Sequence, residues 1–559
     1  MKSFRRKLLS IVMTTAMLVA MLPASAFAAD KTLFDSYVGD NASSGNHPFT
    51  AGVGLRGTAM DKEGNIWFAT KGGGIVRKNT DGTFTFWNKA TKPALKTATI
   101  FGLAVDNNGG VYFTQGAYPG RDDQNFGFGY LKDGTIKYYD TDNSQLPSNY
   151  AQAIAVDDAG IVWIGTEFGL TRFDPKSNSW KTIGMEGNPK DLYHDWYFNH
   201  PEYEGKQGVV AVKESDGFPA WSVQNITKDN NGGLWVGFYP VEDSDGDSEY
   251  AEYPIHGGFS YLKDGKITNY YLVSEFEYNY DYDKCPDQHQ SCKLADSWVR
   301  DITVDANGSA WVTTSGTRQD RHITNHGGHL IYVSQPGAEV IQSEADDLFG
   351  SALRNGYPKK NNYTSEIRMV SFDRYGGMWI GTSYKGIIYV QNPVVKNGKF
   401  KLDVSGQFNA ENNAWNDAAA QLGPKYLNNS ACVDIYGDTI YSGGYTEGMT
   451  SHTFNMDGIY AFPKATVKMK SAKASKGKVK LAWNKASDSN VKSYVVYRSA
   501  KKSSGFKKIA TVKGKTSYTA STKKLKKGKT YYYKIKAKTT IDRITLYSDY
   551  SGVKGAKVK

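Results

Sequence analysis

The sequence predicts an all-β protein in which a seven-bladed β-propeller with four-stranded blades is followed by a small β-sandwich. A short motif recurs seven times between residues 59 and 444, as expected of an architecture built from repeated sheets. The chain is rich in Gly (58), Tyr (38) and Trp (12), which suits many short strands joined by tight turns. After residue 464 the motif stops and the sequence becomes rich in lysine, which indicates a second, smaller domain.

The first 28 residues have the features of a secretory signal peptide. Four Lys and Arg residues within residues 2–7 precede an apolar run over residues 8–22, and small residues around Ala26 fit a cleavage site. The alternative is an N-terminal membrane anchor, but the run is short for a span of about 20 residues. We therefore expect a secreted protein that is associated with the cell surface or cell wall, without a transmembrane segment in the mature chain.

Each copy of the motif consists of an apolar strand, the sequence Asp-x-x-Gly, and a second strand that carries Trp or Tyr. The Asp carboxylate can bond its own turn backbone and the Gly can take a positive φ, so the pair predicts a tight hairpin. The aromatic residue lies on one face of the second strand, where it packs against a neighbouring blade. The motif aspartates are Asp61, Asp106, Asp157, Asp229, Asp305, Asp373 and, in a degenerate seventh copy, Asp434.

A third strand after a glycine and a fourth strand after a second turn complete each repeat. Residues 135–140 and 266–271 are clear examples of the fourth strand. If the degenerate seventh copy does not form a blade, closure with six blades is the alternative. The predicted third strands are the segments GGIVRKN, FGYLKDG, GLTRFDP, GGFSYLKDG, GGHLIYV, GIIYVQN and DGIYAFP.

The motif is clearest in DDAGIVWIGTEFGLTRFD at residues 157–174, which resembles the repeat of two-component regulator propellers and the related repeat of streptogramin B lyase. This resemblance covers residues 32–464 and implies the fold, but propellers host many functions. The lyase pairs a metal with a Glu-x-His motif, and none occurs here. Regulator propellers lie outside a membrane sensor kinase; this sequence shows no kinase region, so a sensing role would need a separate partner.

The direction of the strands predicts where a functional site lies. In a four-stranded blade, the connections from second to third strand and from fourth strand to the next blade emerge at the same end of the ring. The long insertions fall in these two classes, and long loops on a rigid scaffold commonly carry sites. The alternative interpretation is that these insertions have no function and arose because surface loops tolerate changes in length. The insertions are 116–126, 239–256, 315–326 and 445–457 in the first class, and 183–220, 273–297 and 343–365 in the second.

Acidic residues in the insertion of the fourth blade suggest a calcium site, or a site for another divalent cation. Their oxygens alternate along the chain, as hard cations prefer. The pattern departs from the EF-hand because its glycine comes too early, and a solvated acidic loop is the alternative interpretation. The candidate metal ligands are Asp243, Asp245, Asp247, Glu249 and Glu252.

Aromatic, basic and histidine residues of the insertions suggest two kinds of ligand site. Tyr and Trp faces stack on sugar rings and carboxylates accept hydrogen bonds from hydroxyls, so a glycan is one predicted ligand and a peptide another. The predicted ligand-binding residues are Tyr193, Trp196, Tyr253, Arg318 and Arg321. If the protein is an enzyme, the catalytic candidates are His256, His322 and His326.

The three cysteines have no spacing that suits structural zinc. In an oxidising compartment Cys285 and Cys292 can close a loop disulfide, and two free thiols are the alternative. Cys432 lies in an apolar, strand-like segment and is expected to be inert core.

Residues 465–559 resemble a fibronectin type III domain. Val479-x-Leu481-x-Trp483 matches the strand with the core tryptophan, and Tyr531-x-Tyr533 lies in the tyrosine-corner region. This segment has 27 Lys and Arg against three acidic residues, a net charge of +24, whereas residues 29–464 carry −16. Such a charge exceeds what solubility requires. It predicts association with anionic cell-wall polymers, and not with nucleic acid in an exported protein; docking on the acidic propeller and a generic lysine-rich spacer are the alternatives.

The predicted organisation is therefore a signal peptide (1–28), a propeller (29–464) and a fibronectin type III-like domain (465–559). The favoured hypothesis is a secreted or cell-surface protein that binds or senses a glycan or peptide on the long-loop face. The alternative is a propeller lyase or hydrolase that acts on a polysaccharide or cyclic ester with a divalent cation. A purely structural envelope component, which should have no pocket, is the third possibility.

Overall fold

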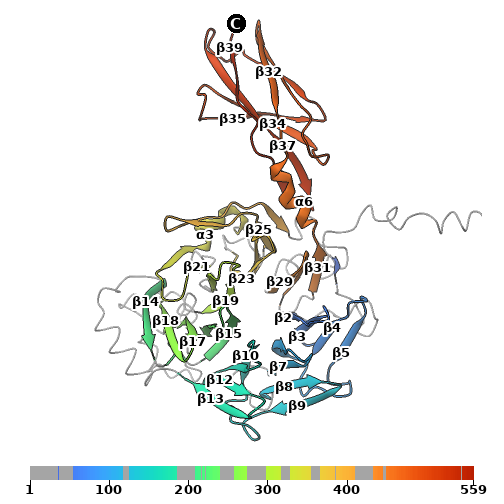
Figure 1. Ribbon diagram of the computed structural model, residues 1–559, viewed down its shortest axis with the longest axis vertical. Coiled ribbons are helices and arrows are strands. Elements are labelled where there is room, and N and C mark those ends of the chain that lie inside the picture. The colour runs from blue at the N-terminus through green and yellow to red at the C-terminus, as the bar shows by residue number, and fades with distance from the viewer. Residues whose placement is uncertain are drawn as a thin grey trace, which may run out of the picture.

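The computed structural model is all-β, with a ring of antiparallel sheets and a β-sandwich beside it (Figure 1). The residues that the structure describes are 35–36, 54–116, 125–184, 208–215, 217–220, 222–239, 257–273, 298–315, 328–353, 365–383, 385–408, 432–444, 449–542 and 544–559.

Seven sheets formed by these residues make the ring, and each has an inner strand nearest the axis. In the order of the blades, the inner strands are β2 (Gly54–Met60), β6 (Ile100–Val105), β10 (Ala151–Val156), β15 (Ser222–Lys228), β19 (Val299–Val304), β23 (Ile367–Phe372) and β29 (Cys432–Tyr436). The second strands are β3 (Ile66–Lys71), β7 (Val111–Gln115), β11 (Val162–Thr166), β16 (Leu234–Tyr239), β20 (Ala310–Thr314), β24 (Met378–Thr382) and β30 (Thr439–Gly443).

The outer half of each sheet is formed by a third and a fourth strand. The third strands are β4 (Ile75–Lys78), β8 (Phe128–Lys132), β12 (Gly169–Asp174), β17 (Gly257–Lys263), β21 (His329–Val333), β25 (Ile387–Val390) and β31 (Met449–Thr453). The fourth strands are β5 (Phe84–Trp87), β9 (Thr135–Tyr139), β13 (Ser179–Ile183), β18 (Lys266–Val273), β22 (Val340–Glu344), β28 (Gly406–Phe408) and, in the last sheet, β1 (Asp35–Ser36).

The ring closes in two ways. Neighbouring inner strands contact one another all the way round, including β29 against β2. In addition, β1 from the N-terminal part of the chain pairs with β31, so that the last sheet combines strands from both ends of the ring. The sequence motif gave no sign of this strand, because β1 lies outside every copy of the repeat.

The motif aspartate acts as predicted, and it also explains the tryptophan six residues later. In the first blade the Asp61 carboxylate accepts hydrogen bonds from Asn65 N at 2.8 Å and from the Trp67 indole Nε1 at 2.8 Å. The same indole bond recurs between Trp163 and Asp157 at 2.9 Å, and between Trp379 and Asp373 at 3.0 Å. In these blades one carboxylate satisfies both the turn and the indole, whose packing fills the space between blades.

The seventh blade corrects two predictions. Asp434 does not begin a turn: it lies within β29, opposite Tyr441, and the turn consists of Gly437 and Asp438. The segment DGIYAFP, predicted to be the third strand, instead forms the helix α6 (Met456–Ala461) and the 3₁₀ turn η9 (Phe462–Lys464). Asn455 accepts a bond from Gly458 N as the N-cap, and such a cap favours a helix over a strand.

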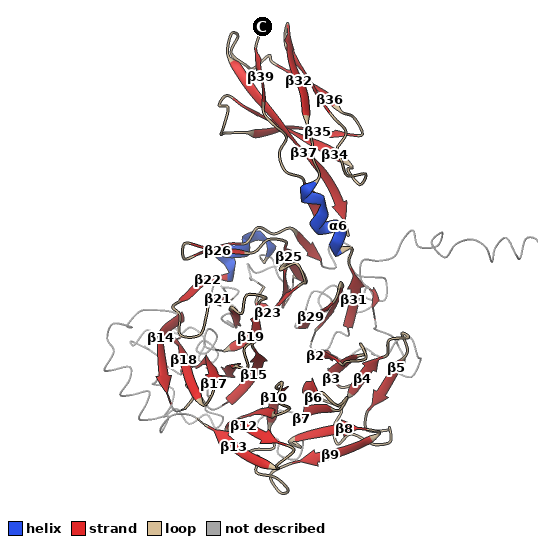
Figure 2. Cartoon of the chain, in the orientation of Figure 1, coloured by secondary structure: helices blue, strands red, loops and turns tan. Residues whose placement is uncertain are grey.

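Further elements are added to the repeat around the fourth, fifth and sixth sheets (Figure 2). A fifth strand, β14 (Gly208–Ser215), pairs with β18 at the edge of the fourth sheet. A short helix, α3 (Ala345–Phe349), continues into η7 (Gly350–Ala352) after the fifth sheet. The hairpin of β26 (Val394–Lys396) and β27 (Lys399–Lys401) lies between the third and fourth strands of the sixth, an exception to the short turns expected there.

Two further sheets form the C-terminal sandwich. One has the order β32 (Met469–Ser475), β33 (Lys478–Trp483), β36 (Ser517–Ser521). The other joins β35 (Lys507–Lys513), β34 (Ser493–Ser499), β37 (Thr530–Ile541) and β38 (Ile544–Tyr547), with β39 (Lys554–Lys557) also on β37. Trp483 is buried between the sheets, as expected of the core tryptophan in a fibronectin type III-like fold.

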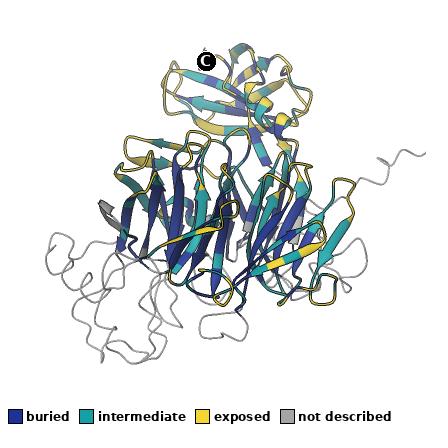
Figure 3. Ribbon diagram, turned by 60° about the horizontal axis from the view of Figure 1, so that its bottom comes forward, coloured by how far each residue is buried: buried dark blue, intermediate teal, exposed yellow. Residues whose placement is uncertain are grey.

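The sandwich lies at one end of the ring (Figure 3), and helix α6 connects it to the motif turn of the sixth blade. The Tyr460 hydroxyl lies 3.0 Å from Asp373 Oδ2 and 2.8 Å from the Tyr389 hydroxyl. Asn455 N donates to Asp542 Oδ2 of the sandwich at 2.7 Å. A continuous apolar core runs from Trp379 through α6 to Trp483. The sandwich is thus attached at the end of the ring opposite to the starts of the inner strands.

Candidate ligand-binding pocket

Irregularities in the inner strands direct side chains toward the axis of the ring. In six inner strands the pairing register skips a position five residues before the motif aspartate. Such a bulge re-aims the extra residue, and bulges are common beside active sites. The residues at these positions are Arg56, Phe101, Gln152, Gln224, Arg300 and Arg368.

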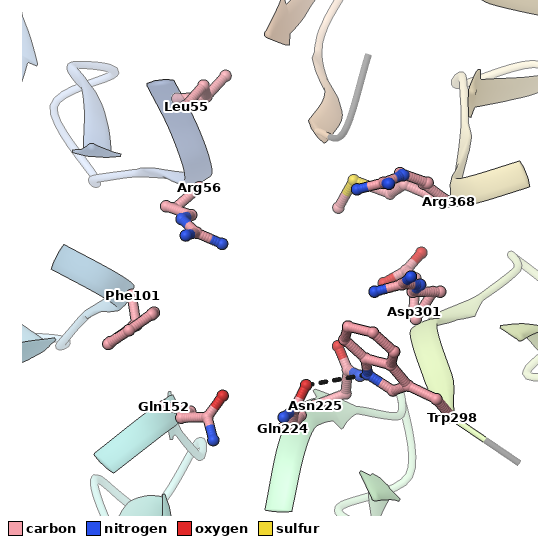
Figure 4. A pocket seen from close by; sticks show the side chains of 11 residues that line it. Leu55, Arg56, Phe101, Gln152, Gln224, Asn225, Trp298, Asp301 and Arg368 are labelled. Carbon is pink, nitrogen blue, oxygen red and sulfur yellow. Dashed lines mark hydrogen bonds between the residues drawn. The ribbon is translucent and has the colours of Figure 1, made fainter. Parts of the chain in front are cut away.

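These six residues line a pocket of about 160 Å³ at the starts of the inner strands (Figure 4). Its volume exceeds that of five water molecules in the liquid, at roughly 30 Å³ each. Strand direction places the pocket at the end of the ring where the predicted long connections begin. The remaining lining residues are Leu55, Asn225, Trp298, Asp301 and Met369.

Two of the three pocket arginines are held by one carboxylate. Arg300 Nη2 lies 2.9 Å from Glu366 Oε1, and Arg368 Nε lies 3.1 Å from Glu366 Oε2. Their side chains are only 6% and 11% exposed, so solvent screens these pairs less than pairs on the surface. The charges are fixed in position before a ligand arrives, and pre-organised groups bind with a smaller entropy cost.

Aromatic rings hold the guanidinium planes. Arg300 lies over Trp298, with 3.3 Å between its Cζ and the ring centroid, and Arg56 lies 5.4 Å from the centroid of Phe101. Arginine combines such stacking with a fork of donors that matches a carboxylate in two places. The pocket therefore has the chemistry to bind an anion that also offers an apolar face.

Asp301 is the one acidic residue among the lining residues. The pKa of its carboxyl is raised to about 7: burial and the charge of Asp434 raise it, while hydrogen bonds from Val370 N and Ile302 N act in the opposite direction. Asp434 itself accepts a bond from Thr58 Oγ1 at 2.7 Å. Near neutral pH this carboxyl is divided between its two protonation states, so the positive charge of the three arginines prevails in the pocket.

Amide side chains complete the polar lining. Trp298 Nε1 donates to Gln224 Oε1 at 3.0 Å, and Asn225 Nδ2 donates to the Val299 carbonyl at 3.1 Å. These bonds orient Gln224 with its amide nitrogen as the remaining donor. Together with Gln152, the wall offers hydrogen bonds to hydroxyl or carbonyl groups of a ligand.

The site residues predicted from the sequence lie outside the described residues. This applies to Tyr193, Trp196, Tyr253, Arg318 and Arg321, to the candidate catalytic residues His256, His322 and His326, and to Asp243, Asp245, Asp247, Glu249 and Glu252. Cys285 and Cys292 also lie outside, whereas Cys432 begins β29 as expected of a strand residue. Within the described part, there is no group of three His, Cys, Asp or Glu side chains arranged to hold a metal ion.

Sequence reasoning missed the axial pocket, although a signal was present. A polar or aromatic residue stands five positions before the motif aspartate in six copies of the repeat. An alternation test alone does not detect this position, because the bulge breaks the two-residue period.

Comparison with known proteins identifies the repeat. Residues 145–168 match the family called two component regulator propeller. The chain resembles two-component regulator propellers. The matching residues include Gln152 of the pocket and the turn of Asp157, so the third blade contains both the family motif and a residue of the site. No curated protein matches the sequence.

Among solved structures, the chain is similar to the extracellular domain of a B. thetaiotaomicron protein described as a one-component system, at 12% identity and a TM-score of 0.44, over 93% of this chain and 59% of that one. A second structure, described as the extracellular domain of a hybrid two-component system from the same organism, is 12% identical with a TM-score of 0.42. That match covers 95% of this chain and 59% of the other. This chain thus spans about three fifths of their length. An Fn3-like protein from Clostridium thermocellum is 25% identical over 18% of this chain and 96% of that chain, with a TM-score of 0.14.

No helix among the described residues is both long and apolar enough to cross a membrane.

Proposed function

We propose that this protein is an extracellular binding or sensing propeller that takes an acidic carbohydrate in its axial pocket. One observation carries the proposal: bulges in successive inner strands gather Arg56, Arg300 and Arg368 around a cavity whose lining contains a single carboxyl group. Residues 29–464 have a net negative charge, so these three arginines form a local positive site in an acidic domain.

The composition of the pocket favours an acidic sugar over a simple inorganic anion. The arginines supply forked donors for a carboxylate, Trp298 and Phe101 supply rings, and Gln152 and Gln224 supply amides for hydroxyl groups. An acidic peptide has carboxylates as an acidic sugar does, but it lacks the hydroxyl groups of a sugar ring. The regulator-propeller repeat supports a sensing role, and the signal-peptide features of residues 1–28 support export.

The C-terminal domain, residues 465–559, is the proposed attachment to the cell wall. Its net charge of +24 supports binding to an anionic polymer, and its place on the far end of the ring leaves the pocket end uncovered by the described residues. The protein would then be retained at the surface while the pocket samples small molecules.

The test is calorimetric titration of the mature chain, with and without calcium. The probes are glucuronate, galacturonate, the matching neutral sugars and an acidic hexapeptide. We expect a hexuronate to bind and its neutral counterpart to bind at least tenfold more weakly, because the charge-assisted bonds are lost. Arg300→Ala should remove most of the affinity. Arg172→Ala, which removes the same charge from outer strand β12, is the control.

Two results would overturn the proposal. One is the absence of binding by both hexuronates. The other is equal loss in Arg300→Ala and Arg172→Ala, which would mean that the pocket is not the site. Tighter binding of the hexapeptide would retain the pocket and replace the ligand class.

A further inference from the structure

The outer face of the five-stranded sheet of the sandwich presents alternating lysines and tyrosines. Lys534, Lys536 and Lys538 alternate along β37, and the intervening Tyr533, Ile535 and Ala537 are buried. On the neighbouring strands, Tyr497 of β34 stands opposite both Lys534 and Lys508, and Lys538 stands opposite Tyr547. We call the set Lys508, Lys534, Lys536, Lys538, Tyr497, Tyr547 and Tyr550 the Lys–Tyr face.

Tyrosine rings position the ammonium groups on this face. Lys534 Nζ lies 3.4 Å and Lys536 Nζ 4.2 Å from the centroid of Tyr550, whose ring packs edge-on against Tyr497 at 5.3 Å. Tyr547 and Tyr550 nevertheless remain 40% and 44% exposed. Each ring thus contacts a lysine while keeping surface for a partner.

No carboxylate neutralises these lysines within the described residues. Of the three acidic residues of the segment, Asp542 accepts a bond from Asn455 N and Asp488 accepts one from Asn490 N. The third, Asp549, is exposed and directly precedes Tyr550. No ion pair in the described part of the chain involves a residue after Asp457. Burial and then the charge of Lys536 lower the pKa of Lys534, which shows the cost of this crowding.

The charges form rows with a short repeat. Alternate residues of a strand are roughly 6.7 Å apart and neighbouring strands about 4.8 Å apart. A row of ammonium groups at this spacing matches a linear polymer with one anion in every short repeating unit. Lysine binds phosphate as a point charge and tolerates variable geometry, which suits a flexible chain.

We propose that the Lys–Tyr face binds a linear polyol-phosphate polymer, with the phosphates on the lysine rows and the polyol units against Tyr547 and Tyr550. This inference rests on the proposed retention at an anionic cell wall, and it assigns that retention to one face of one sheet. The other basic surfaces of the domain are then expected to contribute only general attraction.

The opposite sheet provides a matched control. Lys473, Lys478 and Lys480 are exposed on β32 and β33, with Lys473 opposite Lys480 and with Thr519 and Ser521 alongside. No ring contact of these three lysines is found among the described residues. The two faces therefore differ in tyrosines and resemble each other in charge.

The experiment measures binding of purified poly(glycerol phosphate) to the mature chain at 50 and 200 mM salt. Replacing Lys534, Lys536 and Lys538 by Gln should weaken binding at least about tenfold, while the same change at Lys473, Lys478 and Lys480 should cost less than about threefold. Tyr550→Ala should weaken binding about threefold without changing the salt dependence. Circular dichroism checks that each variant is folded.

Equal losses of polymer affinity in the two triple variants would overturn the assignment, because binding would then depend only on the net charge of the domain. Tighter binding of single-stranded DNA with the same number of phosphates, or of hyaluronate, would overturn the polymer class. If wall fragments retain the protein while poly(glycerol phosphate) does not bind, cell-wall retention stands and this inference fails. Hexuronate binding, measured on the same samples, reports separately on the axial pocket.

Discussion

The axial pocket and the Lys–Tyr face are both positively charged, yet they are built in opposite ways. The pocket holds three arginines in a concave site, where Glu366 and two aromatic rings fix the guanidinium planes. The Lys–Tyr face spreads lysines over an open sheet, and none of them forms an ion pair with a carboxylate of the described residues. Positive charge alone therefore does not define a partner. Guanidinium groups held in fixed orientations select an anion by its shape, whereas rows of ammonium groups select a polymer by the spacing of its anionic groups.

The two regions also differ in how the backbone positions the charged residue. Bulges turn Arg56, Arg300 and Arg368 toward the axis against the regular alternation. On β37, by contrast, regular alternation alone puts the lysines outside and Tyr533, Ile535 and Ala537 inside. Side chains from several strands are thus directed to one point by irregular strands, whereas an extended row of side chains on a sheet requires regular strands.

The largest expected effect separates the two sites completely. Combining Arg56→Ala with Arg300→Ala should weaken hexuronate binding at least about 100-fold, since two charge-assisted contacts of about 1.5–3 kcal/mol each are lost. Poly(glycerol phosphate) binding should stay within about twofold because the two sites lie on different domains. Parallel titrations with both ligands check this. A comparable loss of affinity for both ligands would mean that the pocket and the Lys–Tyr face are not independent sites.

Exchanging arginine and lysine sharpens the comparison. Arg300→Lys should reduce hexuronate affinity about tenfold, because an ammonium group neither stacks flat on Trp298 nor forms a bidentate pair. Lys534→Arg should leave polymer binding within about twofold, because that site uses point charges. Calorimetry on the two variants decides; similar effects at both sites would argue against the fork as the source of selectivity.

A smaller effect should follow pH through Asp301. Its carboxyl has an ordinary pKa of 3.8, raised to about 7 by burial. The folded chain therefore binds a proton that the unfolded chain has lost between about pH 4 and 7, so this group's contribution to stability falls as pH rises through that window. Ionisation also adds a negative charge beside Arg56, Arg300 and Arg368, with Asp434 already close.

We therefore expect hexuronate affinity to fall roughly threefold to tenfold from pH 6 to pH 8, because the ionised carboxylate repels the ligand. Asp301→Asn should flatten both this change and the decline of the melting temperature. Polymer binding on the Lys–Tyr face should not change over the same range. A pH dependence that persists in Asp301→Asn would assign it to another group.

The smallest expected effect concerns the connection between the two regions. Tyr460→Phe removes the hydroxyl that bonds Asp373 and Tyr389, and should lower the free energy of unfolding by about 1 kcal/mol. Asp373 keeps its bonds from Gly377 N and the Trp379 indole. Chemical denaturation measures the change, and neither ligand should bind differently; altered hexuronate affinity would mean that the sandwich influences the pocket.

Much of the architecture could be predicted because local chemistry repeats. The Asp-x-x-Gly turns, the Trp or Tyr that follows and the positions of most third and fourth strands depend on residues close in sequence, and the structure confirms them in the first six blades. The seventh blade was predicted poorly: its turn has two residues, its third strand comes earlier than DGIYAFP, and its fourth strand is β1. There the chain has to close the ring and attach the sandwich, and both demands come from distant partners.

The sequence by itself determined the all-β class, the repeated sheets, the charge contrast between the two parts and the end of the ring from which long connections leave. Only the tertiary structure decided which residues meet at the axis. Arg56, Arg300 and Arg368 are separated by up to 312 positions, and each is aimed by a bulge whose register depends on the paired strand. Convergence of this kind results from ring closure, a property of all the blades together that no local pattern contains.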